Sequence, residues 1–432
     1  MTTRGLVLAA PSSGAGKTVL SLAVMRALRD RGHSVAAAKS GPDYIDPRFH
    51  QAALGAPSQT LDAWAMSVGD LRARVGGLPS GKLLVVEGAM GALDGAPPDG
   101  RGSSADLAEA LGAPVVMILD VSRMAQSAAL PLAGFRALRP GLTVAGAVLN
   151  RVGSERHERM ARRALEAAGF EVFGAVPRDA RLDLPSRHLG LVQAEEHADL
   201  STFIASAAEI VAASLDLDRL AAAAAALEIE GERRPTPPLG ARIAVASDTA
   251  FAFAYPHMLD DWRSAGAEIR TFSPLRDEGP DAEADSVFLP GGYPELHAGR
   301  LSAAAGFRRR MQQAAARGAV IYGECGGFMA LGEGLIDAHG ARWSMLGLVP
   351  LETSFADRKR ALGYRRLSPL EGVPWSIELA GHEHHQATIT AEGRAPRLFA
   401  ARDAEGQDLG PIGLRVGSVM GSFAHVIGRS AP

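Results

Sequence analysis

The feature that most constrains the fold is residues 319–327, AVIYGECGG, where a β-forming apolar run meets a cysteine flanked by glycines. A helix-like segment, FMALGEGL, follows directly. Strand, G-x-nucleophile-x-G and helix in this order form a nucleophile elbow, with cysteine in place of the serine of hydrolases. Glycines on both sides permit the strained backbone that such a turn requires. The pattern predicts an α/β fold that presents Cys325 at a sharp strand-to-helix turn.

Cys325 is the only cysteine in 432 residues, so it can form no disulfide within the chain. A single cysteine also occurs as a small buried apolar side chain. The elbow favours a nucleophile instead, because N–H groups at a helix N-terminus stabilise a thiolate. His425 lies near the end of the run at 418–426, which we expect to be the last strand, and is the candidate general base. We therefore predict a thiol acyl-transfer centre with Cys325 and His425 as catalytic residues.

Backbone N–H groups for an oxyanion hole are expected close to this centre. The strand-like run SVFLP leads into Gly291-Gly292-Tyr293, and Gly326 follows the predicted nucleophile. Free N–H groups at such positions stabilise the negative oxygen of a tetrahedral intermediate. We predict that Gly291, Gly292 and Gly326 form the oxyanion hole.

A second glycine-rich loop lies near the start of the chain. The strand-like GLVLAA (5–10) is followed by PSSGAGKT (11–18) and a helical apolar face, which is the context of a Walker A loop. The N–H groups that would surround the phosphates belong to Ser13, Gly14, Ala15 and Gly16. Lys17 would reach the β- and γ-phosphates, and Thr18 would bind Mg²⁺. Pro11 departs from the motif because it stands at the first glycine.

Polar residues follow several predicted strands of this half, at the edge where open α/β sheets bind ligands. After the strand at 34–39 comes SGPDYIDPRFH (40–50), whose two prolines and glycine predict a loop without regular structure. The substrate candidates there are Lys39, Asp43, Tyr44 and Asp46. A plain solvated loop is the alternative interpretation.

Two further strand ends of the same half carry candidates. Glu87 ends the strand in KLLVVEGAMGALDG (82–95), and Asp94 lies at the far end of the following loop. A carboxylate beside a P-loop is typical of a Mg²⁺ ligand, so Glu87 and Asp43 are the carboxylate candidates for the metal. Asn150 follows the strand at 143–149, a position typical of a residue that reads a purine base.

Strands and helices alternate in both halves, which predicts a parallel sheet covered on both faces. The proline-rich ERRPTPPLG (232–240) is the expected linker between a P-loop domain at 1–231 and a second α/β domain at 241–432. A net charge of −3 gives no electrostatic reason to expect nucleic acid or an anionic membrane as partner. No apolar run reaches the ~20 residues of a membrane span, so we expect a cytoplasmic location.

The C-terminal half also carries a cluster of polar residues, GHEHH, at 381–385. A zincin site requires histidines four residues apart on a helix, whereas position 386 is glutamine and the surrounding runs look β-like. A metal site is therefore disfavoured. Substrate lining by His382 and His384 and ordinary packing both stay open.

Nine motifs together resemble the cobyrinic/hydrogenobyrinic acid a,c-diamide synthase family, in matching order along nearly the whole chain. They are SSGAGKT (12–18), KSGPDYIDP (39–47), EGAMGALDG (87–95), LNRVGSERH (149–157), FSPLRD (272–277), LPGGYPELH (289–297), GECGGFMAL (323–331), LGYR (362–365) and GHEHH (381–385). The resemblance implies an N-terminal domain similar to dethiobiotin synthetase. It also implies a C-terminal domain similar to class I glutamine amidotransferases.

This resemblance implies amidation of the a and c acetate side chains of a corrinoid with ATP, Mg²⁺ and glutamine. Lys17, Thr18 and Glu87 then have phosphate and Mg²⁺ roles. Asp43, Asp46 and Asp94 fall at the corrinoid or acyl-phosphate site, with their individual roles open. Tyr364, His382 and His384 belong to motifs shared with the family and are further substrate candidates. The implied partners are glutamine and a corrinoid polycarboxylate, and a homodimer is compatible with the sequence.

One departure and several alternatives accompany the resemblance. Class I amidotransferases carry glutamate two residues after the catalytic histidine, but that position here is Ile427. The centre is therefore a Cys325–His425 dyad, or its orienting group comes from elsewhere in the chain. A cobyric acid synthase, which amidates other side chains of the macrocycle, and a deviant-Walker ATPase without glutaminase activity are the alternative functions. Whether the macrocycle carries cobalt stays open.

Overall fold

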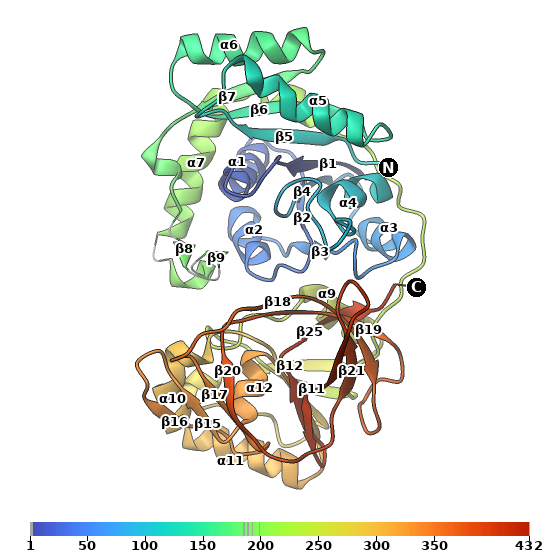
Figure 1. Cartoon of the computed structure of the whole chain (residues 1–432), viewed down its shortest axis with the longest axis vertical. Helices are drawn as coiled ribbons and strands as arrows, with labels where there is room; N and C mark the ends of the chain where they lie inside the picture. Colours follow the sequence, from blue (N-terminus) through green and yellow to red (C-terminus); the bar gives the residue numbers. More distant parts are fainter. Residues whose placement is uncertain (1–2, 185, 188–189, 192, 198, 432) are drawn as a thin grey trace. The chain divides into compact units, whose positions relative to one another are not determined.

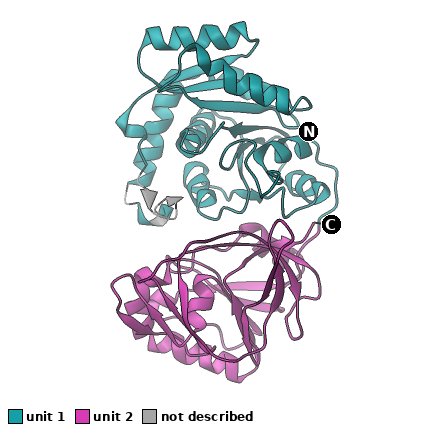
Figure 2. Cartoon of the chain, in the orientation of Figure 1, with its two compact units in different colours: residues 1–233 teal, residues 234–432 magenta. Residues whose placement is uncertain are grey.

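The computed structural model describes residues 3–184, 186–187, 190–191, 193–197 and 199–431. The chain divides into two compact units, residues 1–233 and 234–432 (Figure 2). Within the described residues, no helix is both long enough and apolar enough to cross a membrane.

The first unit is built on an eight-stranded sheet in the order β3-β2-β4-β1-β5-β6-β7, with β10 beside β1. All of these strands pair in parallel except β10, which is antiparallel to β1. Their bounds are β1 Arg4–Ala9, β2 Val35–Ser40, β3 Gln59–Leu61, β4 Leu83–Glu87, β5 Val115–Asp120, β6 Val144–Val152, β7 Val172–Pro177 and β10 Ala225–Ala226. The short strands β8 Ser186–Arg187 and β9 Gly190–Leu191 pair with each other. The predicted parallel sheet is confirmed.

Helices cover both faces of this sheet, with α1, α2 and α7 on one face and α3 and α4 on the other (Figure 1). Their bounds are α1 Lys17–Asp30, α2 Asp46–Leu54, α3 Val68–Gly76, α4 Ser104–Leu111, α5 Ala129–Leu138, α6 Glu155–Ala167, α7 Leu200–Ser214 and α8 Leu217–Ala222, with 3₁₀ turns η1 Gln126–Ala128, η2 Ala180–Leu182 and η3 Ala194–Glu196. Coverage on both faces explains why β4 (LLVVE) is buried along its whole length. The carboxyl ends of β2, β4 and β1 are neighbours, so the three polar loops that follow them meet at one edge.

The second unit contains a six-stranded sheet in the order β12-β11-β13-β14-β24-β23, parallel except for the edge strand β23. A five-stranded antiparallel sheet (β22-β21-β18-β19-β25) and a four-stranded sheet (β16-β15-β17-β20) complete it. The bounds are β11 Arg242–Ala246, α9 Pro256–Ser264, β12 Glu268–Phe272, η4 Pro274–Arg276, β13 Ser286–Leu289, η5 Pro294–His297, α10 Ala298–Ala303, α11 Ala305–Ala316, β14 Val320–Glu324, α12 Gly326–Leu331, β15 Gly334–Ile336, β16 Arg342–Ser344, β17 Leu351–Ser354, β18 Ala361–Pro369, β19 Leu379–His385, β20 Thr388–Glu392, β21 Phe399–Arg402, β22 Asp408–Ile412, β23 Leu414–Val416, β24 Val419–Ser422 and β25 His425–Arg429. The unit is α/β, as predicted.

The prediction that 40–50 lacks regular structure is wrong, because α2 begins within it at Asp46. Pro47 lies in the first turn of this helix, where its missing N–H and fixed φ are compatible with helix geometry. Asp43 accepts hydrogen bonds from the amides of Ile45 (2.7 Å) and Asp46 (3.0 Å). This turn caps the start of the helix and directs the loop into it.

The alanine run at 221–226 favours a helix by composition, yet α8 ends at Ala222 and β10 follows. The alanines at 225–226 pair with Arg4 and Gly5 of β1. Pairing with an available strand outweighs the helix propensity of alanine in this segment.

The single strand predicted at 418–426 is two strands in different sheets. β24 pairs with β14, whereas β25 pairs with β19. The chain leaves the parallel sheet at Phe423, whose ring packs edge-on against Phe328 with centroids 5.5 Å apart. The Glu324 carboxylate then accepts the Val426 N–H at 2.9 Å. His425 consequently belongs to the antiparallel sheet.

Candidate active site

The P-loop connects β1 to α1 and holds two glycines in left-handed backbone, with φ of +81° at Gly14 and +89° at Gly16. A Cβ at Gly16 would also collide with the Asn150 side-chain amide. That amide donates to the Ala15 carbonyl oxygen at 2.8 Å. Asn150 therefore lies against the P-loop, and its predicted role in reading a base stays a prediction.

Arg151 supports the same loop from the end of β6. Its guanidinium donates to the Gly14 carbonyl oxygen at 3.0 Å and pairs with Asp120, at the end of β5, at 2.5 Å. Arg151 has a φ of +59°, an uncommon conformation for a residue with a side chain. The loop is thus fixed by residues from two neighbouring strand ends.

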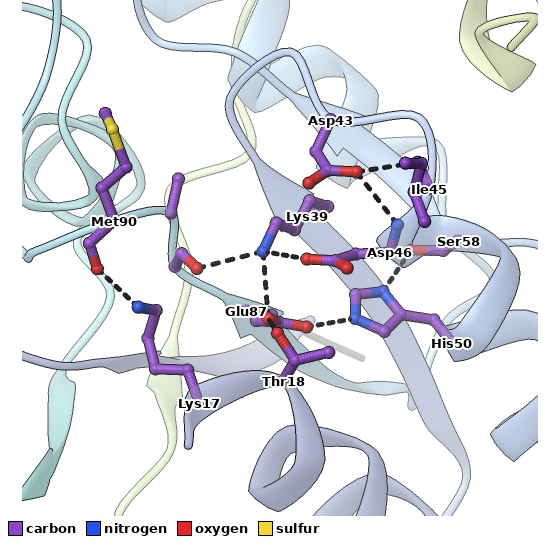
Figure 3. Close-up of polar contacts among 12 residues, drawn as sticks. Lys17, Thr18, Lys39, Asp43, Ile45, Asp46, His50, Ser58, Glu87 and Met90 are labelled. Carbon is purple, nitrogen blue, oxygen red and sulfur yellow. Dashed lines mark hydrogen bonds and ion pairs between the residues drawn. The ribbon is translucent and has the colours of Figure 1, made fainter. Parts of the chain in front are cut away.

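Lys17 points to the loop after β4, where its ammonium donates to the Met90 carbonyl oxygen at 2.5 Å (Figure 3). Burial lowers the pKa of Lys17, and Lys39 acts in the same direction. Asp94 is exposed and accepts the Gly91 N–H at 2.8 Å, so it closes the turn that carries this carbonyl. The structure therefore brings the loop at 88–95 to the P-loop lysine.

Glu87 lies at the centre of the polar contacts in Figure 3 and is fully buried. Its Oε1 accepts the Thr18 hydroxyl at 2.6 Å and the Lys39 ammonium at 3.0 Å. Its Oε2 lies 2.7 Å from His50 Nε2. Burial opposes ionisation, but Lys39, His50 and Thr18 together hold the pKa of Glu87 well below its usual range.

Lys39 joins two carboxylates across this cluster. Its ammonium lies 2.6 Å from Asp46, 3.0 Å from Glu87 and 3.2 Å from the Gly88 carbonyl oxygen. Although burial opposes its charge, the two carboxylates raise the pKa of Lys39. Burial and the neighbouring Asp43 raise the pKa of Asp46 to about 8. Tyr44 is buried next to these residues in the chain.

His50 was not recognised in the sequence, although it belongs to this cluster. It is fully buried on α2, with Nδ1 2.9 Å from the Ser58 hydroxyl and Nε2 on Glu87. The signal was weak, because His50 lies in a segment that was expected to be a loop. Once α2 is known, His50 follows Asp46 by four residues and lies on the same helix face.

The residues present fit a magnesium ion bound with a nucleotide at the P-loop. Because the Thr18 hydroxyl donates its hydrogen to Glu87, its oxygen lone pairs are directed away from that carboxylate. Glu87 Oε1 already accepts two donors, so Thr18 would be the direct ligand of such an ion and Glu87 would orient it. The predicted roles of Glu87 and Asp43 as direct metal ligands stay predictions.

In the second unit, Cys325 lies between β14 and α12 with φ +45° and ψ −107°. A non-glycine residue in such a conformation costs on the order of 1–3 kcal/mol and is retained where the surrounding structure imposes it. The Cys325 N–H donates to the Ser422 carbonyl oxygen at 2.9 Å. Side chains at Gly323 or Gly327 would collide with neighbouring backbone. The predicted elbow is therefore present in the structure.

Gly291 lies between the two predicted catalytic side chains. A Cβ built on it would collide with His425 Cε1 and lie 3.0 Å from His425 Nε2 and 3.3 Å from Cys325 Cβ. A Cβ on Gly326 would lie 2.9 Å from the Gly292 nitrogen. The structure thus brings together all five residues predicted for this centre, from three separate segments of the chain.

Burial acts against the charged form of both catalytic candidates. Burial, with a smaller effect from Glu295, raises the pKa of the Cys325 thiol well above its usual value. Burial lowers the pKa of His425 to about 3, and His382 acts in the same direction. The preference for a thiolate at the helix N-terminus stays a prediction. The thiol must lose its proton to a base during the reaction.

Tyr364, His382 and His425 are directly opposite one another on the adjacent strands β18, β19 and β25. Opposite residues on antiparallel strands share a face, so these side chains form a row that ends at the candidate base. The His382 ring lies 5.4 Å from Tyr364 and 6.2 Å from His384, between ring centroids. The residues therefore lie in the second unit beside the cysteine centre, and their predicted contact with substrate stays a prediction.

The described residues contain no group of three or more His, Cys, Asp or Glu side chains arranged to hold a metal ion. Within GHEHH, Glu383 pairs instead with Arg365 at 2.6 Å, and the His385 ring stacks on Phe423. These contacts account for two members of the cluster by packing and charge pairing.

Comparisons with known proteins agree with the two centres. Residues 6–192 match the CobQ/CobB/MinD/ParA nucleotide binding domain, and residues 242–432 match the CobB/CobQ-like glutamine amidotransferase domain. Three curated relatives carry the name hydrogenobyrinate a,c-diamide synthase. The Brucella anthropi protein is 53% identical over 431 residues and 98% of each chain. The Rhizobium meliloti protein is 54% identical over 98% of this chain and 99% of its own, and the Rhodobacter capsulatus protein is 47% identical over 98% of each.

Likeness to solved structures is weaker. The structure of PurLQS from Thermotoga maritima aligns with a TM-score of 0.31 and 16% identity over 44% of this chain and 87% of that chain.

Proposed function

The chain belongs to the hydrogenobyrinate a,c-diamide synthase family, and we propose that it converts the a and c acetate carboxylates of hydrogenobyrinic acid to amides with ATP and glutamine. The observation that carries the proposal is identity of about one half over 98% of both chains, with a phosphate-binding centre in one unit and a thiol centre in the other. The relatives' name favours the metal-free corrinoid over cobyrinic acid.

The glutaminase step belongs to the second unit. Cys325 attacks the glutamine side-chain carbonyl while His425 takes the thiol proton, and the N–H groups of Gly291, Gly292 and Gly326 stabilise the oxyanion. His425 returns the proton to the leaving nitrogen, which departs as ammonia. Water then hydrolyses the thioester to glutamate and restores the thiol. A buried neutral histidine suits the first step, because it can accept the proton.

The ligase step belongs to the first unit. A carboxylate is a poor acyl donor, so the substrate carboxylate attacks the γ-phosphorus of ATP and gives an acyl phosphate and ADP. Phosphate oxygens would replace the Met90 carbonyl as acceptors for Lys17, and the backbone amides of the P-loop would bind them. Bound Mg²⁺, held through Thr18, would neutralise phosphate charge. Ammonia then displaces phosphate from the acyl carbon and leaves the amide.

The charges around Lys39 affect how the carboxylate of the substrate can bind in this unit. Asp43, Asp46 and Glu87 place three carboxylates next to one buried ammonium. These three carboxylates outnumber the ammonium, so they would repel a further carboxylate brought by the corrinoid acid. Lys17 or the metal ion would therefore have to offset the charge of the substrate carboxylate.

The proposal is tested by incubating the protein with ATP, Mg²⁺ and glutamine plus either hydrogenobyrinic acid or its cobalt-containing counterpart. We expect a diamide from the metal-free acid, identified by mass, with one ADP and one glutamate released for each amide. Faster turnover of the cobalt corrinoid would overturn the choice of substrate. ATP hydrolysis without glutamine hydrolysis or amide formation would favour the ATPase alternative.

A further inference from the structure

The second unit lacks the glutamate that orients the histidine in similar centres. Ile427 occupies that position, and its side chain is fully buried and apolar. Its carbonyl oxygen accepts from His257 Nε2 at 2.6 Å, so this residue has a structural contact unrelated to His425. The Cys325–His425 pair therefore needs another group to fix the ring and its tautomer.

Glu324, the residue directly before the nucleophile, lies where such a group is required. It ends β14, is 1% exposed, and places Oε2 3.8 Å from His425 Nδ1. Its other oxygen accepts the Val426 N–H at 2.9 Å. The carboxylate is therefore held by the residue that follows His425, and the two groups approach each other from adjoining sheets.

The two edges of the His425 ring have different surroundings. Nε2 and Cε1 face Gly291, which also borders Cys325 Cβ, whereas Nδ1 faces Glu324. A general base for Cys325 must carry its proton on Nδ1 so that Nε2 is free to accept one. A carboxylate next to Nδ1 favours this tautomer, because it can accept the Nδ1 hydrogen.

We propose that Glu324 is the positioning residue of the glutaminase centre: it fixes the His425 ring with Nε2 directed to Cys325 and stabilises the imidazolium that forms when the thiol is deprotonated. The inference rests on the proposed glutaminase function. Burial raises the pKa of Glu324 and lowers that of His425, so each charge alone is costly, whereas the Val426 N–H lowers the pKa of Glu324 and favours the carboxylate form that accepts the Nδ1 hydrogen. Ionising both together offsets that cost. Hydrogen bonds between catalytic groups are often long before substrate binds, so a separation of 3.8 Å is compatible with this role.

Glu324→Gln separates this role from simple support of the backbone. The Val426 N–H requires an oxygen on its side of residue 324, so the glutamine would keep that hydrogen bond with Oε1. Its NH₂ group would then face His425 Nδ1. A donor at this position favours the tautomer with hydrogen on Nε2, which cannot accept the thiol proton.

The experiment compares glutaminase kinetics of wild type, Glu324→Gln, Glu324→Ala and Glu352→Gln. Glu352 is the matched control, because its carboxylate pairs with Arg342 at 2.6 Å in a different sheet of the same unit. We expect Glu324→Gln to lower kcat by about 100-fold or more, as loss of an orienting carboxylate does elsewhere, with KM changed by less than about threefold. Glu324→Ala should lose at least as much, and Glu352→Gln should match wild type.

Because Cys325 is the only cysteine, alkylation by iodoacetamide reports its deprotonation directly. We expect slower alkylation of Glu324→Gln than of wild type in the absence of glutamine. If Glu324→Gln keeps the kcat and the alkylation rate of the wild type, the inference is overturned. Glu324 would then serve only to accept the Val426 N–H. If wild type itself lacks glutaminase activity, the proposed function fails instead.

A measurement on the wild-type protein covers the case in which the variants do not fold. Imidazole ¹⁵N resonances of His425 should report hydrogen on Nδ1 at neutral pH. Hydrogen on Nε2 in the wild type would refute the role of Glu324.

Discussion

Lys39→Met should destabilise the first unit strongly. The Lys39 side chain is 4% exposed and is the ammonium shared by Asp46 and Glu87, which are 10% and 0% exposed. Methionine preserves most of the volume but removes the cation, leaving two buried carboxylates without their partner. Breaking a buried ion pair from one side costs about 3–5 kcal/mol. An opening equilibrium in this region would then increase by roughly 10²- to 10⁴-fold.

Hydrogen exchange followed by mass spectrometry measures this cost locally, since a chain with two units has no single unfolding transition. Peptides from β2 and β4 should exchange faster in Lys39→Met, whereas peptides from β13 and β14 should be unchanged. Arg159→Met is the control, because its pair with Glu155 at 3.7 Å is exposed, with side chains 60% and 95% accessible. Such a pair contributes at most about 1 kcal/mol.

The pH dependence of the stability difference between the wild type and Lys39→Met is an independent check of this prediction. In the wild type Lys39 helps to hold the pKa of Glu87 below its usual range, so this contribution to stability is lost as the pH falls. Without Lys39, burial raises the carboxylate pKa values in the folded protein, so protonation stabilises the variant as the pH falls. The Glu87 contribution is present above about pH 4.5 and lost below it, so the difference in stability between the two proteins should shrink as the pH falls below about 5. A change of less than about tenfold in exchange, or a difference that grows in acid, would refute the reasoning.

Three further predictions concern single features. Lys17→Ala should lower amidation by about 10³-fold or more with either glutamine or ammonia, because phosphoryl transfer depends on that cation; near wild-type rates with ammonia would exclude the P-loop assignment. Gly291→Ala places a methyl group against His425 and should lower glutaminase activity by about 100-fold while ammonia-dependent amidation continues. Loss of both activities in the folded variant would contradict it. Purified protein should contain no stoichiometric zinc by metal analysis; zinc lost on replacing His382 and His384 by alanine would reverse the packing interpretation.

The sequence predicted the chemistry that depends on local backbone pattern. The P-loop and the Cys325 elbow each need glycines at fixed spacing between a strand and a helix, and these patterns are visible in the residue order. The strand ends carrying Lys39 and Glu87 followed from short apolar runs. Contact between these two side chains could also be predicted, because neighbouring parallel strands end at the same edge of a sheet.

What could not be predicted depends on contacts between distant segments. Glu324 looked like an ordinary residue of the elbow, because its role arises only when β25 returns beside β14. His50 was not predicted because the prolines in 40–50 indicate a loop, although proline is compatible with the first turn of a helix. The break at Phe423 was not visible, since the run at 418–426 contains no proline or charged residue to mark the end of a strand. The hydrogen bond from Asn150 to the Ala15 carbonyl oxygen was not visible in the sequence either, and the role of Asn150 in reading a base stays a prediction.

The measurement that tests the central claim most directly is amidation by Cys325→Ala with each nitrogen source. The account assigns ammonia production to the thiol and carboxylate activation to the P-loop unit, which needs no sulfur. The variant should therefore lose glutamine hydrolysis and glutamine-dependent amide formation. It should retain ATP-dependent amidation with excess ammonium salt at mildly alkaline pH, where free ammonia is available. Product mass and ADP release report both outcomes. Glutamine turnover by Cys325→Ala, or loss of the ammonia-dependent reaction in the folded variant, would contradict the account.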